Sequence, residues 1–133
     1  MGATVIPILR YRDAAAAIRF LADAFGFEAA LVVEGQDETI EHAQLRFGSG
    51  MVMVGTARDD EFGRLVGGSD RPIRGSIYVI VDDVDAHAER ARGAGAEIVV
   101  EPTAQDYGGS DYVAADPEGN IWSFGSYDPW AAG

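Results

Sequence analysis

The alternation of apolar and polar residues predicts two helices and eight strands, in the same order in each half of the chain. Apolar residues at helical spacing predict helices over 14–25 and 84–94. Gly26 follows the first of them, where a C-terminal glycine is common. Alternation with a period of two predicts strands over 4–12, 27–34, 39–47, 51–54, 76–81, 97–101, 111–115 and 120–126.

Residues with similar roles recur at an offset of 69 positions (82 − 13 = 69). The pairs are Asp13 and Asp82, Ala22 and Ala91, Gly26 and Gly95, Glu28 and Glu97, and Gly50 and Gly119. Because several of these pairs fall at helix caps and turns, they indicate a tandem βαβββ repeat. We expect one domain over residues 1–133, with a first module at about 3–56, a linker at about 57–74 and a second module at about 75–127.

The repeat predicts an α+β fold in which each module packs one helix on one face of a small, curved, mixed sheet. The second face of each sheet is left exposed unless something covers it. Two halves, from one chain or from two chains, can close around a shared cavity, and this is where we expect a ligand.

Composition narrows the choice of partners. With 133 residues and 47% hydrophobic content, the chain is long enough for one ordinary core. The formal net charge of -12 opposes binding to nucleic acid. The chain has no Cys, which excludes disulfides and suits the cytoplasm. No apolar run approaches the roughly 20 residues that span a bilayer, so we expect a soluble protein without a membrane partner.

Three stretches carry a resemblance to a known family: residues 11–13 before the first helix, residues 82–85 with the later Gly93-Ala94-Gly95-Ala96, and residues 116–120 before the last strand. They resemble the vicinal oxygen chelate superfamily, which includes glyoxalase I, extradiol dioxygenases and bleomycin-resistance proteins. The His42-Ala43 pair and the ending Trp122-Ser123-Phe124-Gly125 look most like small PhnB-like or glyoxalase-like members.

The resemblance implies a divalent metal with four ligands, two on the first strands of the repeats and two on the last strands. In this chain those positions are Ile6 or Pro7, Ser76, Val54 and Ser123. Ile, Pro and Val cannot ligate a metal, and a lone Ser hydroxyl is a poor ligand. His42 and His87 are the only imidazoles, and His87 is expected to be solvated on the second helix. We therefore expect no metal and no cofactor.

The remaining polar and aromatic candidates suit ligand binding. His42, Gln44 and Arg46 share one face of the strand 39–47, and Tyr107 and Tyr112 flank a glycine-rich loop that would form a pocket mouth. The family topology implies that Ile8, Arg10, Val54, Tyr78, Ile80 and Ser123 also point inward, while Trp122 and Phe124 pack under the second helix. The candidate ligand-binding residues are Arg10, His42, Gln44, Arg46, Tyr78, Tyr107, Tyr112 and Ser123.

These groups suit a medium-sized, partly planar organic molecule better than a bare ion. The resemblance to resistance proteins implies a homodimer that sequesters a small molecule, such as an antibiotic or another natural product, without metal and without catalytic residues. The alternative is a lyase, isomerase or dioxygenase with a non-standard metal site around His42 or a metal-free proton transfer. A third hypothesis is a structural or regulatory protein, with Trp130 contributing to an apolar surface.

Overall fold

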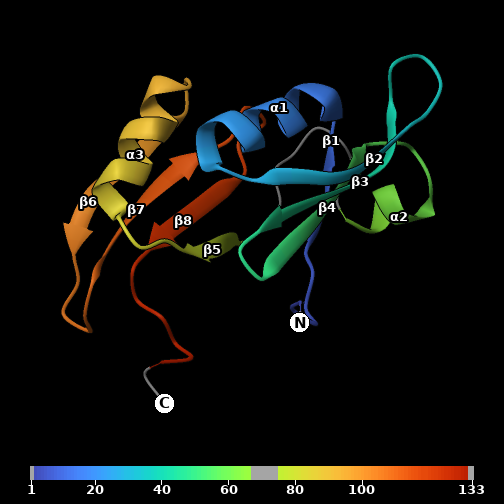
Figure 1. Cartoon of the computed structure of the whole chain (residues 1–133). Coiled ribbons are helices and arrows are strands. Elements are labelled where there is room, and N and C mark those ends of the chain that lie inside the picture. The colour runs from blue at the N-terminus through green and yellow to red at the C-terminus, as the bar shows by residue number, and fades with distance from the viewer. Residues whose placement is uncertain (1, 67–74, 132–133) are drawn as a thin grey trace. The chain divides into compact units, whose positions relative to one another are not determined.

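A computed structural model describes residues 2–66 and 75–131. The chain divides into two compact units, Met1–Ile73 and Arg74–Gly133, and each contains one four-stranded mixed sheet with one long helix (Figure 1). This confirms the predicted α+β fold with two βαβββ modules. Within the described residues, every helix is too short or too polar to cross a lipid bilayer.

The first unit contains β1 (Ile8–Tyr11), α1 (Ala14–Phe25), β2 (Glu28–Glu34), β3 (Ile40–Phe47), β4 (Gly50–Thr56) and α2 (Glu61–Leu65). Its sheet has the order β1-β4-β3-β2, in which β1 runs parallel to β4 and the other neighbours are antiparallel. The Asp13 carboxylate caps α1 by accepting from the Ala16 N–H, and Gly26 ends the helix at a φ of 86°.

One face of this sheet is buried with α1. The buried strand residues are Leu9, Tyr11, Ala43, Leu45, Val52 and Val54, and the buried residues of α1 include Leu21, Ala24 and Phe25. The spacing of the apolar residues along α1 places them on one side of the helix, so that the helix and the sheet share one core.

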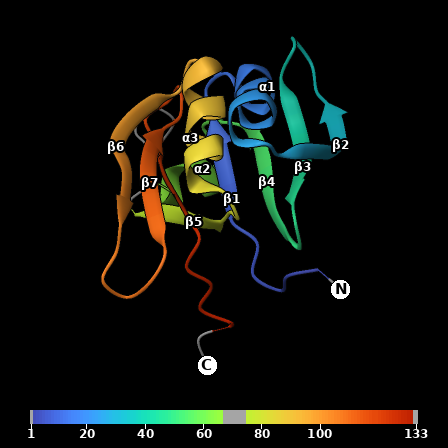
Figure 2. The ribbon, with the colours of Figure 1, turned by 60° about the vertical axis from the view of Figure 1, so that its left-hand side comes forward.

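The second unit contains β5 (Ser76–Ile80), α3 (Val84–Gly93), β6 (Glu97–Ala104), β7 (Ser110–Ala115) and β8 (Ile121–Gly125). Its sheet has the corresponding order β5-β8-β7-β6, and α3 packs against β6 and β7 (Figure 2). The core of this unit includes Tyr112, Ala114, Trp122 and Phe124 with Val84, Ala88 and Ala91 of α3. The predicted burial of Trp122 and Phe124 under the second helix is confirmed.

The offset between the two units is not constant, which corrects the repeat of 69. The cap of α3 is Asp83 rather than Asp82, so the caps lie 70 positions apart (83 − 13 = 70). Gly26 and Gly95 both adopt positive φ. These two glycines do lie 69 positions apart, because α3 has one residue fewer than α1 between its cap and its glycine. In the last strands the offset is again 70, since Ile8 pairs with Met53 as Tyr78 pairs with Ser123.

The offset returns from 69 to 70 in the last strands because the turn before β8 is longer than the turn before β4. Two residues, Gly48 and Ser49, separate the paired Phe47 and Gly50, whereas three residues separate Asp116 from Asn120, whose carbonyl accepts the Asp116 N–H. Because side chains alternate between the two faces of a strand, this one added residue places each residue of β8 on the face opposite to the one that the constant offset of 69 predicts from β4.

The predicted linker contains a short helix that the sequence pattern missed. The helix α2 is capped by Asp60, whose carboxylate accepts from the Gly63 N–H at 2.7 Å. The part of the predicted linker at 67–74 lies outside the described residues.

A buried carboxylate organises the turn before β8. Asp116 Oδ1 accepts from the backbone N–H groups of Glu118 and Asn120, and Oδ2 accepts from Asn120 Nδ2 and from Trp122 Nε1, at 3.0 to 3.1 Å. Because Asp116, Asn120 and Trp122 are all buried, water cannot replace these bonds without rearrangement of the turn.

We predict that Asp116→Ala lowers the free energy of unfolding by about 3 kcal/mol, because it removes the carboxylate that accepts buried hydrogen bonds from the side chains of Asn120 and Trp122. Urea denaturation followed by tryptophan fluorescence measures the change. Asp106→Ala, at an exposed position, is the control and should change the stability by less than about 0.5 kcal/mol. Equal stability of the two variants would contradict this role of Asp116.

Candidate functional site

In each unit, the sheet face opposite its long helix carries the chemically diverse side chains, and we call it the open face of that unit. The register of the first sheet places Ile8, Met53, Gln44 and Leu31 in one row across it. In the next row Arg10 lies beside Gly55. In the second sheet the equivalent rows are Tyr78, Ser123, Val113 and Val100, and then Ile80, Gly125 and Asp111.

Arg10 is held on the open face of the first unit by α2. Its side chain is only 16% exposed, and the guanidinium carbon lies 4.7 Å from the centroid of the Phe62 ring. Its Nη1 atom lies 3.6 Å from Asp60 Oδ1, which is too long for a hydrogen bond. This buried Nη1 is without a hydrogen-bond partner in the described part of the chain. Arg10 therefore has an unsatisfied donor, which a ligand oxygen reaches only when the side chains that cover it move aside.

Asp60 joins Arg10 to an exposed ion-pair network. The N–H of Gly63, followed by the charges of Arg10 and Arg58, holds the pKa of Asp60 below its ordinary value. Arg58 also pairs with Glu41 at 3.3 Å. Asp60 thus remains ionised near neutral pH and balances the charge of Arg10 without accepting a hydrogen bond from its Nη1.

His42 and Gln44 lie next to each other on the open face of β3. Their Nε2 atoms are 3.0 Å apart, and because an amide nitrogen can only donate, Gln44 donates to His42. His42 Nε2 is then an acceptor, and the ring proton resides on Nδ1. The pair offers a ligand the Nδ1–H of His42 and the carbonyl oxygen of Gln44, one donor and one acceptor.

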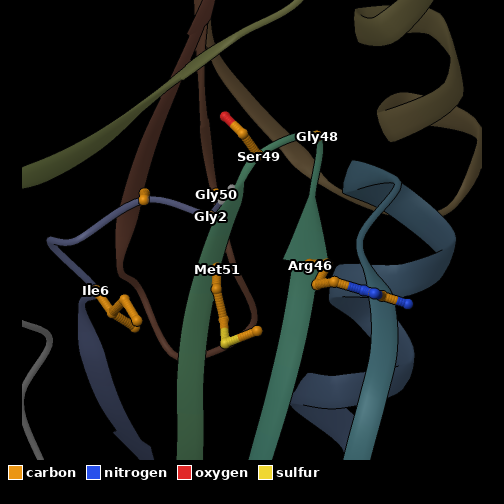
Figure 3. Close-up of a pocket in the computed structure, with 8 residues that line it drawn as sticks. Gly2, Ile6, Arg46, Gly48, Ser49, Gly50 and Met51 are labelled. Atoms are coloured by element: carbon orange, nitrogen blue, oxygen red, sulfur yellow. The ribbon is translucent and has the colours of Figure 1, made fainter.

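Arg46 lies at the other end of β3, beside a shallow pocket of about 590 Å³ (Figure 3). The pocket is lined by Gly2, Ala3, Ile6, Arg46, Gly48, Ser49, Gly50 and Met51. The Arg46 side chain points away from Met51, and its Nη2 donates to Glu28 Oε1 of β2 at 2.8 Å. Since both partners are exposed, this ion pair contributes little to stability.

Tyr78 and Asp111 meet over Gly125 on the open face of the second unit. A Cβ at Gly125 would lie 2.9 Å from Tyr78 Cε1 and 3.0 Å from Asp111 Cβ, so both side chains occupy the space that the glycine leaves. The Tyr78 hydroxyl donates to the Tyr127 carbonyl at 2.8 Å. Burial, and then the charge of Asp111, raises the pKa of Tyr78.

Tyr107 is an exposed aromatic residue fixed by a carboxylate. Its hydroxyl donates to Asp111 Oδ2 at 2.9 Å, while Gln105 Nε2 donates to Asp111 Oδ1 at the same distance. The hydrogen bond to Asp111 raises the pKa of Tyr107. The ring meets that of Tyr127 edge to face, with centroids 5.1 Å apart.

Two predicted site residues lie in cores instead. Tyr112, placed by the sequence at a pocket mouth, is fully buried, and its hydroxyl lies 2.6 Å from His87 Nδ1 on α3. Burial raises the pKa of Tyr112.

Val54 was predicted to point inward with Arg10, but it is buried and pairs with Leu9, so Met53 lies on the open face instead. Nor is His87 a purely solvated residue, since its ring packs 4.4 Å from that of Phe124.

Tyr107 lies in the loop before β7, and the other predicted residues fall in two groups. Arg10, His42, Gln44 and Arg46 share the open face of the first unit, and Tyr78 and Ser123 that of the second. Sequence reasoning missed Phe62, Asp111 and Tyr127. Asp111 could have been found from the alternation of β7, where it has the parity of Val113, whereas Phe62 has no periodic signal because α2 is only 5 residues long.

A family profile described as Glyoxalase/Bleomycin resistance protein/Dioxygenase superfamily matches residues 4–124. The chain belongs to this superfamily. Such an assignment agrees with the duplicated βαβββ modules and confirms the resemblance seen in the sequence.

Individual relatives within the superfamily support the assignment. An uncharacterized protein of Mycobacterium tuberculosis (strain ATCC 25618 / H37Rv) is 35% identical over 127 residues, covering 90% of this chain and 71% of the relative. The crystal structure of TioX from Micromonospora sp. ML1 is 33% identical, covers 93% of this chain and 98% of that chain, and gives a TM-score of 0.77. Glyoxalase I from Zea mays, 22% identical with a TM-score of 0.72, covers 92% of this chain and 43% of that chain and shows the fold alone.

A divalent metal of the kind used by superfamily enzymes does not fit the donors present. With the corrected register, the implied positions hold Ile6, Met53, Ser76 and Ser123. Isoleucine has no donor atom, and a thioether with two hydroxyls is a poor set for a hard or borderline divalent cation. No group of three His, Cys, Asp or Glu residues within 2–66 and 75–131 is arranged to hold a metal ion. The predicted non-standard metal site around His42 lacks the further ligands it would need in this part of the chain.

We predict that Gly125→Ala destabilises the second unit by about 1 to 3 kcal/mol, because the new methyl group would displace the Tyr78 ring and break its bond to Tyr127. Thermal unfolding with near-ultraviolet circular dichroism reports both effects. Gly93→Ala is the matched control. Gly93 is the last residue of α3, and a Cβ added there would lie in open space among the described residues, so this substitution should raise the stability by up to about 1 kcal/mol. Similar effects of both substitutions would contradict the packing of Tyr78 over Gly125.

Proposed function

We propose that this protein binds a small organic molecule on the open faces of its sheets and does so without a metal. The observation that carries the proposal is the buried Nη1 of Arg10, which has no hydrogen-bond partner among the described residues. A buried charged donor without an acceptor is costly, and a ligand oxygen would satisfy it.

The surroundings of Arg10 indicate the kind of ligand. Phe62 already lies over the guanidinium group, so an aromatic ligand could stack beside it. Ile8 and Met53 add apolar surface in the neighbouring row, and the His42–Gln44 pair adds one donor and one acceptor. A planar molecule with a carbonyl or carboxylate oxygen matches this set.

The finer proposal is stoichiometric sequestration of a natural product such as an antibiotic, by a cytoplasmic homodimer. Its support is membership of a superfamily whose description includes bleomycin resistance proteins, together with the poor fit of the donors to a catalytic metal. The absence of Cys suits the cytoplasm. Sedimentation velocity tests the dimer directly.

Arg10→Met should weaken binding of the tightest ligand at least tenfold, because the methionine keeps apolar bulk and removes the donor. Isothermal titration calorimetry with a panel of aromatic antibiotics and other natural products identifies the ligand and measures the change. Arg19→Met, at an exposed position on α1, is the control and should bind like the parent protein. No binding across a broad panel, or equal affinity in the two variants, would count against the proposal.

We also predict that protein purified without a histidine tag carries well under one equivalent of Ni, Zn, Fe or Mn and binds its ligand equally well after treatment with a chelator. Elemental analysis by mass spectrometry measures the content. About one tightly held metal ion per chain, lost in His42→Ala, would favour the lyase, isomerase or dioxygenase alternative instead.

A further inference from the structure

Three tyrosines and a carboxylate gather on the open face of the second unit and its adjoining loops. Tyr107 donates to Asp111 and meets Tyr127 edge to face, while Tyr78 donates to the carbonyl of Tyr127 and lies against Gly125. We call Tyr78, Tyr107, Asp111 and Tyr127 the tyrosine cluster. Their rings come from β5, from the loop before β7 and from the segment after β8.

The charge of Asp111 is not neutralised within this cluster. Its two oxygens accept from Tyr107 and Gln105, which are both neutral donors. Among residues 2–66 and 75–131, no Arg or Lys forms an ion pair with Asp111. The two hydrogen bonds hold the carboxylate in a fixed orientation, yet its full negative charge remains.

The rings and the carboxylate are accessible to a ligand. Tyr107 is 59% exposed, Tyr78 is 40% exposed, and Asp111 is partly exposed. Burial, and then the charge of Asp111, raises the pKa of Tyr78, and the hydrogen bond to Asp111 raises the pKa of Tyr107.

We infer that the tyrosine cluster recognises the positively charged nitrogen of an organic ligand, such as a substituted ammonium group. The electron-rich faces of tyrosine rings attract a cation, and a partly desolvated carboxylate adds a direct charge interaction. The net charge of -12 attracts a cationic ligand over longer distances. The inference rests on the proposed function, since it needs the open face to accept a ligand, but it uses none of the residues around Arg10.

A purely structural role for Asp111 leads to a different expectation. In that case Asp111 only fixes the loop at 105–110 through Gln105 and Tyr107, and the protein would not distinguish a cation from a neutral molecule of the same shape. Selectivity between two such molecules therefore separates the two roles.

The test is a two-dimensional NMR titration of the full chain with choline and with 3,3-dimethylbutan-1-ol, its uncharged isostere. We expect choline to bind at least tenfold more tightly, with shift changes at the tyrosine cluster that diminish as salt is added. Asp111→Asn should reduce this selectivity several-fold, while the ring faces retain the remainder. Asp106→Asn removes the same charge from an exposed position of the same loop and should keep the selectivity. Tyr107→Leu should weaken choline binding several-fold, because it removes one ring.

The outcomes separate this inference from the proposed function. If a panel ligand binds in an Arg10-dependent way but choline and its isostere bind equally, the inference is overturned and the proposed function stands. If choline binds and Asp111→Asn behaves like Asp106→Asn, the carboxylate has only the structural role and the inference is again overturned. If neither choline nor any panel ligand binds, both fail.

Discussion

The burial of one sheet face by one helix is the constraint on which the rest of this structure depends. Among the residues that the structure describes, each unit has a four-stranded sheet and only one helix long enough to cover it, so the alternation along each strand divides residues between a core and an open face. Leu9, Val54 and Leu45 pack with α1, while Arg10, Met53 and Gln44 stand on the other face of the same strands. The chemistry of the molecule follows from this division.

The two units carry opposite charges in equivalent rows of their sheets, although the charged side chains come from different strands. Gly55 and Gly125 are equivalent residues of β4 and β8. In the first unit that row carries Arg10, whose guanidinium group lies against Phe62. In the second it carries Asp111, surrounded by tyrosines. A duplicated module with diverged side chains can thus offer a donor in one unit and a negative charge in the other.

Periodicity predicted the elements well because the covering helices are amphipathic and their ends carry local signals. The bounds of α1 matched the prediction, and its cap by Asp13 and its end at Gly26 depend only on neighbouring residues. Val54 was misplaced because one extra residue in the turn after Asp116 reverses the parity of β8 relative to β4. Tyr112 was misplaced because its polar hydroxyl is satisfied in the core by His87, a long-range contact that no local pattern encodes.

The central claim is that ligands bind to the open faces of the sheets. The most direct measurement is NMR mapping of backbone amide and methyl shifts in labelled protein during titration with the tightest ligand of the panel. The account predicts the largest changes at open-face residues, with Met53 and Gln44 among them, and small changes at Val54 and along the outer surface of α1 and α3. Chemical-shift changes centred on the helices, with none at the open-face residues, would contradict it.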